Sequence, residues 1–129
     1  MGELSALFSP ERIAVVGATE RAGSVGRAIM ENLLDSFAGE VVPVNPSHEE
    51  VFGIPTLDDV AAADADLAVV VVPPQIAVDV VREAGEAGVR NVVVITAGFG
   101  ETGSEGAARE QDLIEVAETY DIDLVGPNS

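Results

Sequence analysis

The sequence contains no cysteine and no lysine among its 129 residues. Without cysteine, a disulfide framework, a thiolate metal site and a cysteine nucleophile are all excluded. The six basic residues are all arginines, and they stand against 23 aspartates and glutamates, which gives a net charge of −17. Proteins that bind nucleic acid or an anionic membrane neutralise phosphate groups with Lys and Arg, so the charge argues against both kinds of partner.

The acidic residues are spread along the chain and alternate with apolar segments, unlike those of an acidic tail. Hydrophobic residues make up 47% of the sequence, which is enough for a packed core. An acidic, lysine-free surface around an ordinary core is typical of a halophilic protein, because high salt screens the repulsion between like charges. A merely acidic protein without salt adaptation is the alternative.

Sequence signals for membrane targeting are also missing. Residues Met1–Leu4 lack a basic region and a long apolar run, so no signal peptide is predicted. The longest apolar run, Leu67–Pro74, is too short to span a bilayer. We therefore expect a cytoplasmic protein.

The chain does contain a regular alternation of short β-branched runs and helix-like segments. Strands are predicted at 12–16, 40–44, 67–72, 91–95 and 122–125. The spacing of apolar residues predicts helices over 26–37, from 74 to about 88 and from about 103 to 120. A capping box at Thr56–Asp59 predicts a short helix at 60–63.

This alternation predicts an α/β fold: a Rossmann-like, doubly wound, five-stranded parallel sheet with helices on both faces. The favoured order of the strands, numbered along the chain, is 3-2-1-4-5. The flavodoxin-like order 2-1-3-4-5 stays open, because periodicity alone does not separate the two. In both orders a ligand is expected at the carboxyl ends of the strands, beside the first strand.

A glycine-rich turn at 17–26 follows the first strand and opens a helix. The backbone N–H groups of Gly23, Ser24 and Val25 can point outward there, which makes a candidate anion site without lysine. The spacing Gly-x5-Gly-x2-Gly matches neither the dinucleotide fingerprint nor a Walker A loop. The turn therefore predicts a phosphate-bearing ligand, with a purely structural helix–strand turn as the alternative.

The end of the second strand narrows the choice of ligand. Proteins that bind NAD or FAD usually place an acidic residue there, whereas this chain has Asn45, followed by Pro46, Ser47 and His48. A neutral amide tolerates a phosphorylated ribose that a carboxylate would repel, which favours NADP or coenzyme A; an ordinary Asn-Pro turn is the structural alternative. His48 is expected to be solvated, since catalysis or metal binding would need partners that the sequence does not offer.

Two more loops leave the same edge of the predicted sheet. Val72, Pro73 and Pro74 form a rigid exit from the third strand, and 95–100 after the fourth strand offers exposed backbone and two glycines. Each loop alone is more typical of structure than of function, but with the glycine turn they predict three sides of one cleft. Ser24 lies in a phosphate-type turn rather than on a nucleophile elbow, so Ser/His/Asp catalysis is not predicted.

An ordered series of short motifs resembles one known family. The motifs are Ile13–Ala18 with Gly23 and Gly26, Pro43–Pro46, Val71–Pro74, Ile95–Phe99 and Gly126–Asn128. From about Leu7 to Ser129, the chain is similar to the N-terminal CoA-binding domain of ADP-forming acyl-CoA synthetases of the acetate–CoA ligase type, relatives of the succinyl-CoA synthetase α subunit.

The resemblance implies that residues 1–129 are a single CoA-binding domain, the N-terminal piece of a ligase that converts acyl-CoA, ADP and phosphate reversibly to acid, CoA and ATP. It implies CoA or acyl-CoA as ligand and, as partners, a phosphohistidine domain and an ATP-grasp domain, without which the isolated chain is expected to be inactive. It implies no catalytic residue and no metal ligand here. The CoA-binding residues that we expect are Gly17, Ala18, Thr19, Arg21, Ala22, Gly23, Ser24, Val25, Gly26, Asn45, Pro46, Ser47, Val72, Pro73, Pro74, Ile95, Thr96, Ala97 and Gly98.

Within that set, the resemblance implies a division of roles. Residues 22–25 would contact the CoA phosphates, Asn45 and Ser47 would lie near the adenosine end, and residues 95–97 would follow the pantetheine arm. Relatives often carry Lys near position 47, where this chain has serine, so backbone dipoles, Arg21 and His48 are left to meet the phosphates.

Three alternatives to a ligase domain stay open at this point: a stand-alone CoA-binding protein, an NADP-binding oxidoreductase domain, and a synthetase-like domain of a protein acetyltransferase. Relatives continue beyond the position of Ser129, so the chain is expected to be a fragment of a longer protein.

Overall fold

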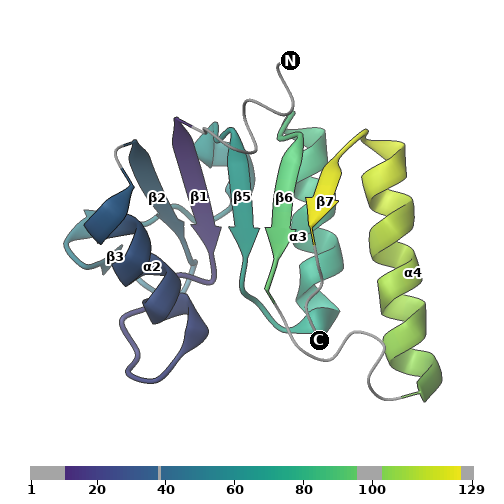
Figure 1. The fold of residues 1–129 in the computed structure, drawn as a ribbon, viewed down its shortest axis with the longest axis horizontal. Helices are drawn as coiled ribbons and strands as arrows, with labels where there is room; N and C mark the ends of the chain where they lie inside the picture. The colour runs from purple at the N-terminus through teal and green to yellow at the C-terminus, as the bar shows by residue number, and fades with distance from the viewer. Residues whose placement is uncertain (1–10, 38, 96–102, 126–129) are drawn as a thin grey trace.

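The computed structural model describes residues 11–37, 39–95 and 103–125 (Figure 1). Within them, five parallel strands form one sheet in the order β2-β1-β5-β6-β7. The strands are β1 (Arg12–Val16), β2 (Glu40–Val44), β5 (Leu67–Val70), β6 (Asn91–Val94) and β7 (Asp123–Val125). The predicted doubly wound parallel sheet is confirmed.

The favoured strand order is wrong, and the flavodoxin-like alternative is the one observed. In the order of the chain the sheet reads 2-1-3-4-5, because β1 pairs with β2 on one side and with β5 on the other. Strand β2 lies at the edge, where, within the described residues, Leu57 forms a single bridge to Val44 and donates to the carbonyl oxygen of Pro43 at 3.0 Å. An edge position suits a strand with an internal proline, since no central ladder needs the missing N–H group.

The connection from β2 to β5 contains the predicted short helix at 60–63 and one element that was not predicted. It contains a short antiparallel hairpin, β3 (Glu50–Val51) and β4 (Ile54–Pro55), that the sequence did not predict, and a 3-10 helix, η1 (Val60–Ala63). Asp59 caps η1 by accepting from the Ala62 N–H at 3.2 Å. The predicted capping box at Thr56 is wrong, because the Thr56 hydroxyl donates to the carbonyl oxygen of His48 instead.

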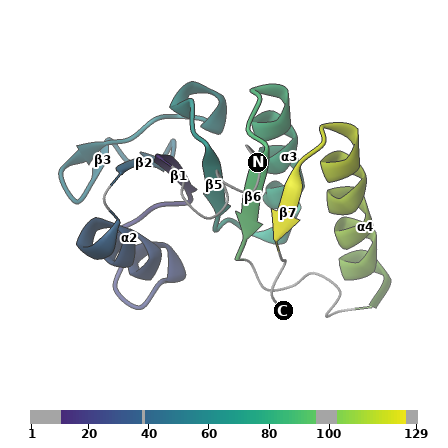
Figure 2. The same ribbon diagram turned by 45° about the horizontal axis from the view of Figure 1, so that its top comes forward.

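Helices cover both faces of the sheet (Figures 1 and 2). Helix α2 (Val25–Ser36) packs on one face, where its buried Met30 joins apolar side chains of β1 and β2. On the other face, η1, α3 (Pro74–Glu86) and α4 (Gly103–Thr119) pack over a second apolar cluster, in which Leu113 is fully buried. The short strands thus form a core that is apolar on both sides, as parallel strands require.

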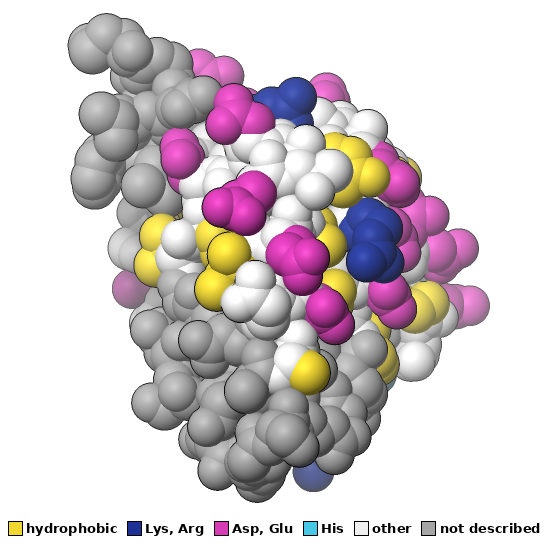
Figure 3. All heavy atoms as spheres, turned by 90° about the vertical axis from the view of Figure 1, so that its right-hand side faces the viewer, with side chains coloured by type: hydrophobic (Ala, Val, Ile, Leu, Met, Phe, Trp, Pro, Cys, Tyr) yellow, Lys and Arg dark blue, Asp and Glu magenta, His cyan; other side chains and the backbone are white. Residues whose placement is uncertain are grey.

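The surface carries the acidic excess of the sequence. Figure 3 views the side on which α4 lies and shows many Asp and Glu side chains with few arginines. Exposed acids on this helix include Asp112, Glu115 and Glu118. In the described ranges, no helix combines the length and the apolar content needed to cross a membrane.

Candidate functional site

A cleft of about 740 Å³ opens at the carboxyl edge of the sheet, where β1, β2 and β5 end. Its volume falls in the range of sites for small-molecule ligands, and its place beside β1 is the switch point at which doubly wound sheets bind them. Residues expected from the sequence that line it are Gly17, Thr19, Arg21, Ser24, Val25, Gly26, Asn45, Pro46, Ser47, Val72 and Pro73.

Two glycines allow the backbones around this cleft to pack closely. Gly17 has a φ of +94°, and a Cβ atom on it would lie 2.3 Å from the carbonyl oxygen of Val71. A Cβ atom on Gly26 would lie 2.6 Å from the carbonyl oxygen of Gly17. The end of β1, the first turn of α2 and the exit of β5 can therefore meet only because these residues lack side chains.

The first turn of α2 presents free backbone donors. Ser24 caps the helix: its Oγ accepts from the N–H of Arg27 at 3.2 Å, and its carbonyl oxygen accepts from the N–H of Ala28 at 3.2 Å. The N–H groups of Val25 and Gly26 then have no acceptor in the part of the chain that the structure describes. Ser24 lines the cleft, but the prediction that its N–H group points outward is wrong, because this group donates inside the turn, to the carbonyl oxygen of Arg21 at 3.2 Å.

Ala22 and Gly23 lie on the other side of this turn and do not line the cleft. They border a second, shallower hollow of about 470 Å³ that Ser24 and Arg27 also line. Gly23 has a φ of +80°, and a Cβ atom built on it would have no neighbour within 4 Å. The space beside Gly23 is therefore open to a bound group.

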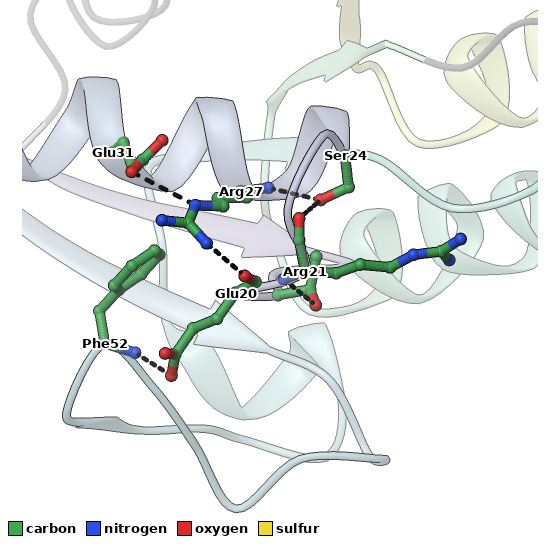
Figure 4. A network of polar contacts seen from close by, with 7 residues as sticks. Glu20, Arg21, Ser24, Arg27, Glu31 and Phe52 are labelled. Carbon is green, nitrogen blue, oxygen red and sulfur yellow. Dashed lines mark hydrogen bonds and ion pairs between the residues drawn. The ribbon is translucent and has the colours of Figure 1, made fainter.

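Arg21 lines the cleft with an uncommitted guanidinium group. Among the described arginines, Arg12, Arg27 and Arg82 form ion pairs with carboxylates at 3.2, 3.3 and 2.9 Å. Arg90 donates to a backbone carbonyl at 2.8 Å. The Arg21 side chain has no such partner among the described residues and extends away from the neighbouring polar contacts (Figure 4). Its positive charge is thus available to an anionic ligand.

Asn45 connects two of the loops that line the cleft. Its Nδ2 donates to the carbonyl oxygen of Ala18 at 2.9 Å, and its Oδ1 accepts from the N–H of Ser47 at 2.9 Å. The amide is thus held by protein contacts and faces the cleft as a neutral surface. His48 is exposed, as expected, and also lines the cleft.

An apolar wall of the cleft was missed by the sequence analysis. It consists of Val60 from η1 and of Ile76 and Val80 from α3. Ile76 is 47% exposed although it is a large hydrophobic residue. Ligand clefts are lined mainly by apolar side chains, and this wall emerges only when α3 is placed against the sheet.

Acidic residues on this side of the cleft were missed as well. Asp58, Asp59 and Glu83 line it. Glu83 is exposed, but partial desolvation, followed by the nearby charges of Asp59, Asp79 and Glu86, raises its pKa above the ordinary value. Across the described ranges, no group of three or more His, Asp and Glu side chains is arranged to hold a metal ion.

The remaining predicted residues lie elsewhere. Ala18 is fully buried and contributes its carbonyl oxygen to Asn45. Ile95 is half-buried and packs with the apolar cluster under α2, so the expectation that it lines the cleft is not met. Its position follows from β6, whose alternate residues face opposite sides of the sheet. Residues 96–98 and the side chain of Pro74 lie outside the described residues.

Comparisons of the sequence with a family model and with individual proteins agree on one family. A family model described as a CoA binding domain matches residues 11–129. The chain is 46% identical over 124 residues to an ADP-forming acetate–CoA ligase I of Archaeoglobus fulgidus, which covers 95% of this chain and 18% of that protein. It is 42% identical over 127 residues to the α subunit of an ADP-forming acetate–CoA ligase II of Pyrococcus furiosus, covering 97% of this chain and 28% of that protein.

A solved structure has the same fold over nearly the whole of this chain. The apo form of acetyl-coenzyme A synthetase 1 of Ca. Korarchaeum cryptofilum superposes with a TM-score of 0.89 at 38% identity, over 97% of this chain and 28% of that one. The chain therefore spans less than a third of the length of each of these three proteins.

Proposed function

Because the chain belongs to the family of CoA binding domains, we propose that its cleft holds coenzyme A as the CoA-binding part of an ADP-forming acyl-CoA ligase. Coenzyme A is the ligand of the family. One observation supports this placement: the unpaired N–H groups at the start of α2 and the unpaired guanidinium group of Arg21 lie at the same cleft. A domain of net charge −17 has few places where a polyanion is attracted, and this is one.

The CoA phosphates would lie at the glycine turn. The N–H groups of Val25 and Gly26 point from the positive end of the α2 dipole, and Arg21 adds a full charge. The residues present therefore fit a pyrophosphate without the lysine that relatives often carry near position 47.

The uncharged parts of CoA would lie away from the turn. Ile76 and Val80 offer an apolar surface, while Asp59 and Glu83 repel phosphate groups from that side of the cleft. Asn45 and Ser47 provide a neutral polar surface at the end of β2, which suits the adenosine end with its ribose phosphate. The cleft is thus polarised, with donors on one side and carboxylates on the other.

The role of this chain in the reaction would be to bind and orient CoA. Bound CoA supplies the thiol that carries the acyl group. We propose that the parent protein is a multidomain or multisubunit synthetase whose phosphohistidine and ATP-grasp parts perform phosphate transfer outside this chain. The ligase relatives, of which this chain matches 18% and 28%, support that division.

The test is a calorimetric titration of CoA into the wild-type chain and into Gly23→Val in molar KCl. Gly23 lies on the other side of the turn from the cleft, but its φ of +80° is one that β-branched residues disfavour, so valine would distort the turn and we expect CoA binding to be lost. Gly88→Val is the matched control, because Gly88 also has a positive φ, of +94°, and open space around it, but lies at the end of α3. Equal CoA affinity in both variants would remove the turn from the site.

A further inference from the structure

Glu20 lies inside the turn that the proposed function assigns to the CoA phosphates. A carboxylate in this position repels a polyanionic ligand, which by itself weakens binding. The hydrogen bonds that its side chain and its backbone form indicate a structural role for Glu20 that outweighs this repulsion.

The Glu20 side chain reaches across to the β3–β4 hairpin. Its Oε2 accepts from the backbone N–H of Phe52 at 2.8 Å (Figure 4). Phe52 has a φ of +51° and, with Gly53 at +79°, forms the tight turn of the hairpin. A non-glycine residue in this left-handed conformation is strained, and the charge-assisted hydrogen bond offsets the strain.

Arg27, which belongs to α2, contacts both Glu20 and Phe52. Its Nη1 donates to the backbone carbonyl oxygen of Glu20 at 2.8 Å, and its guanidinium carbon lies 5.7 Å from the centre of the Phe52 ring. An ion pair of 3.3 Å between its Nε and Glu31 fixes the arginine in this position. Figure 4 shows these contacts joining the turn, the helix and the hairpin.

We infer that Glu20 is a positioning residue. Its hydrogen bond to the Phe52 N–H, which we call the clasp, holds the glycine turn in the shape that binds phosphate. Ala18 and Ser24 are already fixed, by Asn45 and by the helix cap, so Glu20 fixes the middle of the segment between them. The clasp keeps Arg21 and the first N–H groups of α2 oriented before the ligand arrives, which lowers the entropy lost on binding. This inference rests on the proposed function and adds the β3–β4 hairpin to the site.

The direction in which CoA affinity changes when Glu20 is replaced separates this positioning role from a simple charge effect. Glu20→Ala removes a negative charge near the ligand, so electrostatics alone would tighten CoA binding. Loss of the clasp would instead weaken it, by about tenfold in Kd. Glu20→Gln also removes the charge but keeps an oxygen that accepts from Phe52, so we expect affinity equal to or tighter than wild type.

The experiment measures CoA affinity of these two variants by calorimetry in molar KCl. Asp35→Ala serves as the control, because it removes the same charge from an exposed position in the last turn of α2. We expect Glu20→Ala to bind about tenfold more weakly than wild type, and Glu20→Gln and Asp35→Ala to lose no affinity. Glu20→Ala binding as tightly as wild type, or more tightly, would overturn the inference.

A second measurement keeps this test separate from the test of the ligand. Amide hydrogen exchange of Phe52 in the chain without CoA should accelerate in Glu20→Ala and stay at the wild-type rate in Glu20→Gln. An unchanged rate in Glu20→Ala would contradict the clasp whatever the ligand is. If the wild-type chain binds no CoA but exchange at Phe52 still accelerates in Glu20→Ala, the proposed function is refuted and the clasp is supported.

Discussion

The side-chain amide of Asn45 donates to the carbonyl oxygen of Ala18 at 2.9 Å and so ties the end of β2 to the turn that follows β1. The same amide accepts from the N–H of Ser47 at 2.9 Å. One uncharged side chain therefore fixes two walls of the cleft. A carboxylate could not replace it, because an ionised Asp has no hydrogen to donate to Ala18.

Asn45→Asp should consequently damage both stability and binding. Loss of the donor opposite Ala18 should lower the free energy of unfolding by about 1–3 kcal/mol. The added charge in the cleft should weaken CoA binding about tenfold or more. Urea denaturation and calorimetry in molar KCl measure the two effects. Asn32→Asp adds the same charge at an exposed position of α2, and equal CoA affinity in both variants would contradict this role of Asn45.

Gly17→Ala tests the close packing of backbones at the switch point. Gly17 and Gly88 share a φ of +94°, but only at Gly17 would a Cβ atom collide with backbone, 2.3 Å from the carbonyl oxygen of Val71. We expect Gly88→Ala to destabilise the chain by about 1 kcal/mol and Gly17→Ala by roughly 3 kcal/mol or more. Equal shifts of the urea midpoint in the two variants would show that β1 and β5 do not pack this way.

Glu83→Gln should stabilise the domain at neutral pH. Partial desolvation and the neighbouring Asp59, Asp79 and Glu86 raise the pKa of Glu83 in the folded chain, so its charged form is less favourable there than in the unfolded chain. Stability due to this group therefore falls as pH rises through its titration. We expect a higher Tm for Glu83→Gln than for wild type at pH 7.

That difference should close in acid, since below about pH 4 Glu83 is mostly protonated in both the folded and the unfolded chain. Glu118→Gln removes the same charge from α4, outside the group of carboxylates that acts on Glu83, and provides the control. A wild-type Tm at pH 7 equal to or above that of Glu83→Gln would contradict the raised pKa of this carboxyl group.

Thermal stability should rise with KCl. Repulsion among 23 carboxylates extends over a Debye length of about 30 Å at 0.01 M salt and about 3 Å at 1 M. The ion pairs of Arg12, Arg27 and Arg82 have exposed carboxylate partners and contribute little, so their screening should not reverse the trend. Melting curves between these salt concentrations measure the effect. A constant Tm would remove the argument for salt adaptation.

Much of the fold could be predicted from local patterns. The apolar run at 67–72 and the helical spacing at 26–37 are visible along the chain. The strand forms over Leu67–Val70, two residues shorter than predicted, and the helix over Val25–Ser36. The strand order was predicted wrongly, although Pro43 already pointed to an edge position for the second strand. The β3–β4 hairpin was missed because strands of two residues leave no periodic signal.

The candidate site could be predicted only where it depends on sequence neighbours. Gly17, Ser24 and Asn45 belong to turns with recognisable chemistry, and the structure brings them to one cleft. The contacts of Glu20 with Phe52 and the acidic environment of Glu83 join segments far apart in the chain, so no local pattern reveals them. The expected roles of residues 96–98 stay predictions.

Parallel titrations of CoA and NADP into the wild-type chain in molar KCl test the central claim most directly. The neutral Asn45 surface alone accommodates either ligand, whereas the family favours CoA. We expect CoA to bind, NADP to bind roughly 100-fold more weakly or not at all, and the CoA affinity not to fall as KCl is raised, because salt screens the repulsion from the acidic surface. NADP binding without CoA binding would contradict the assignment.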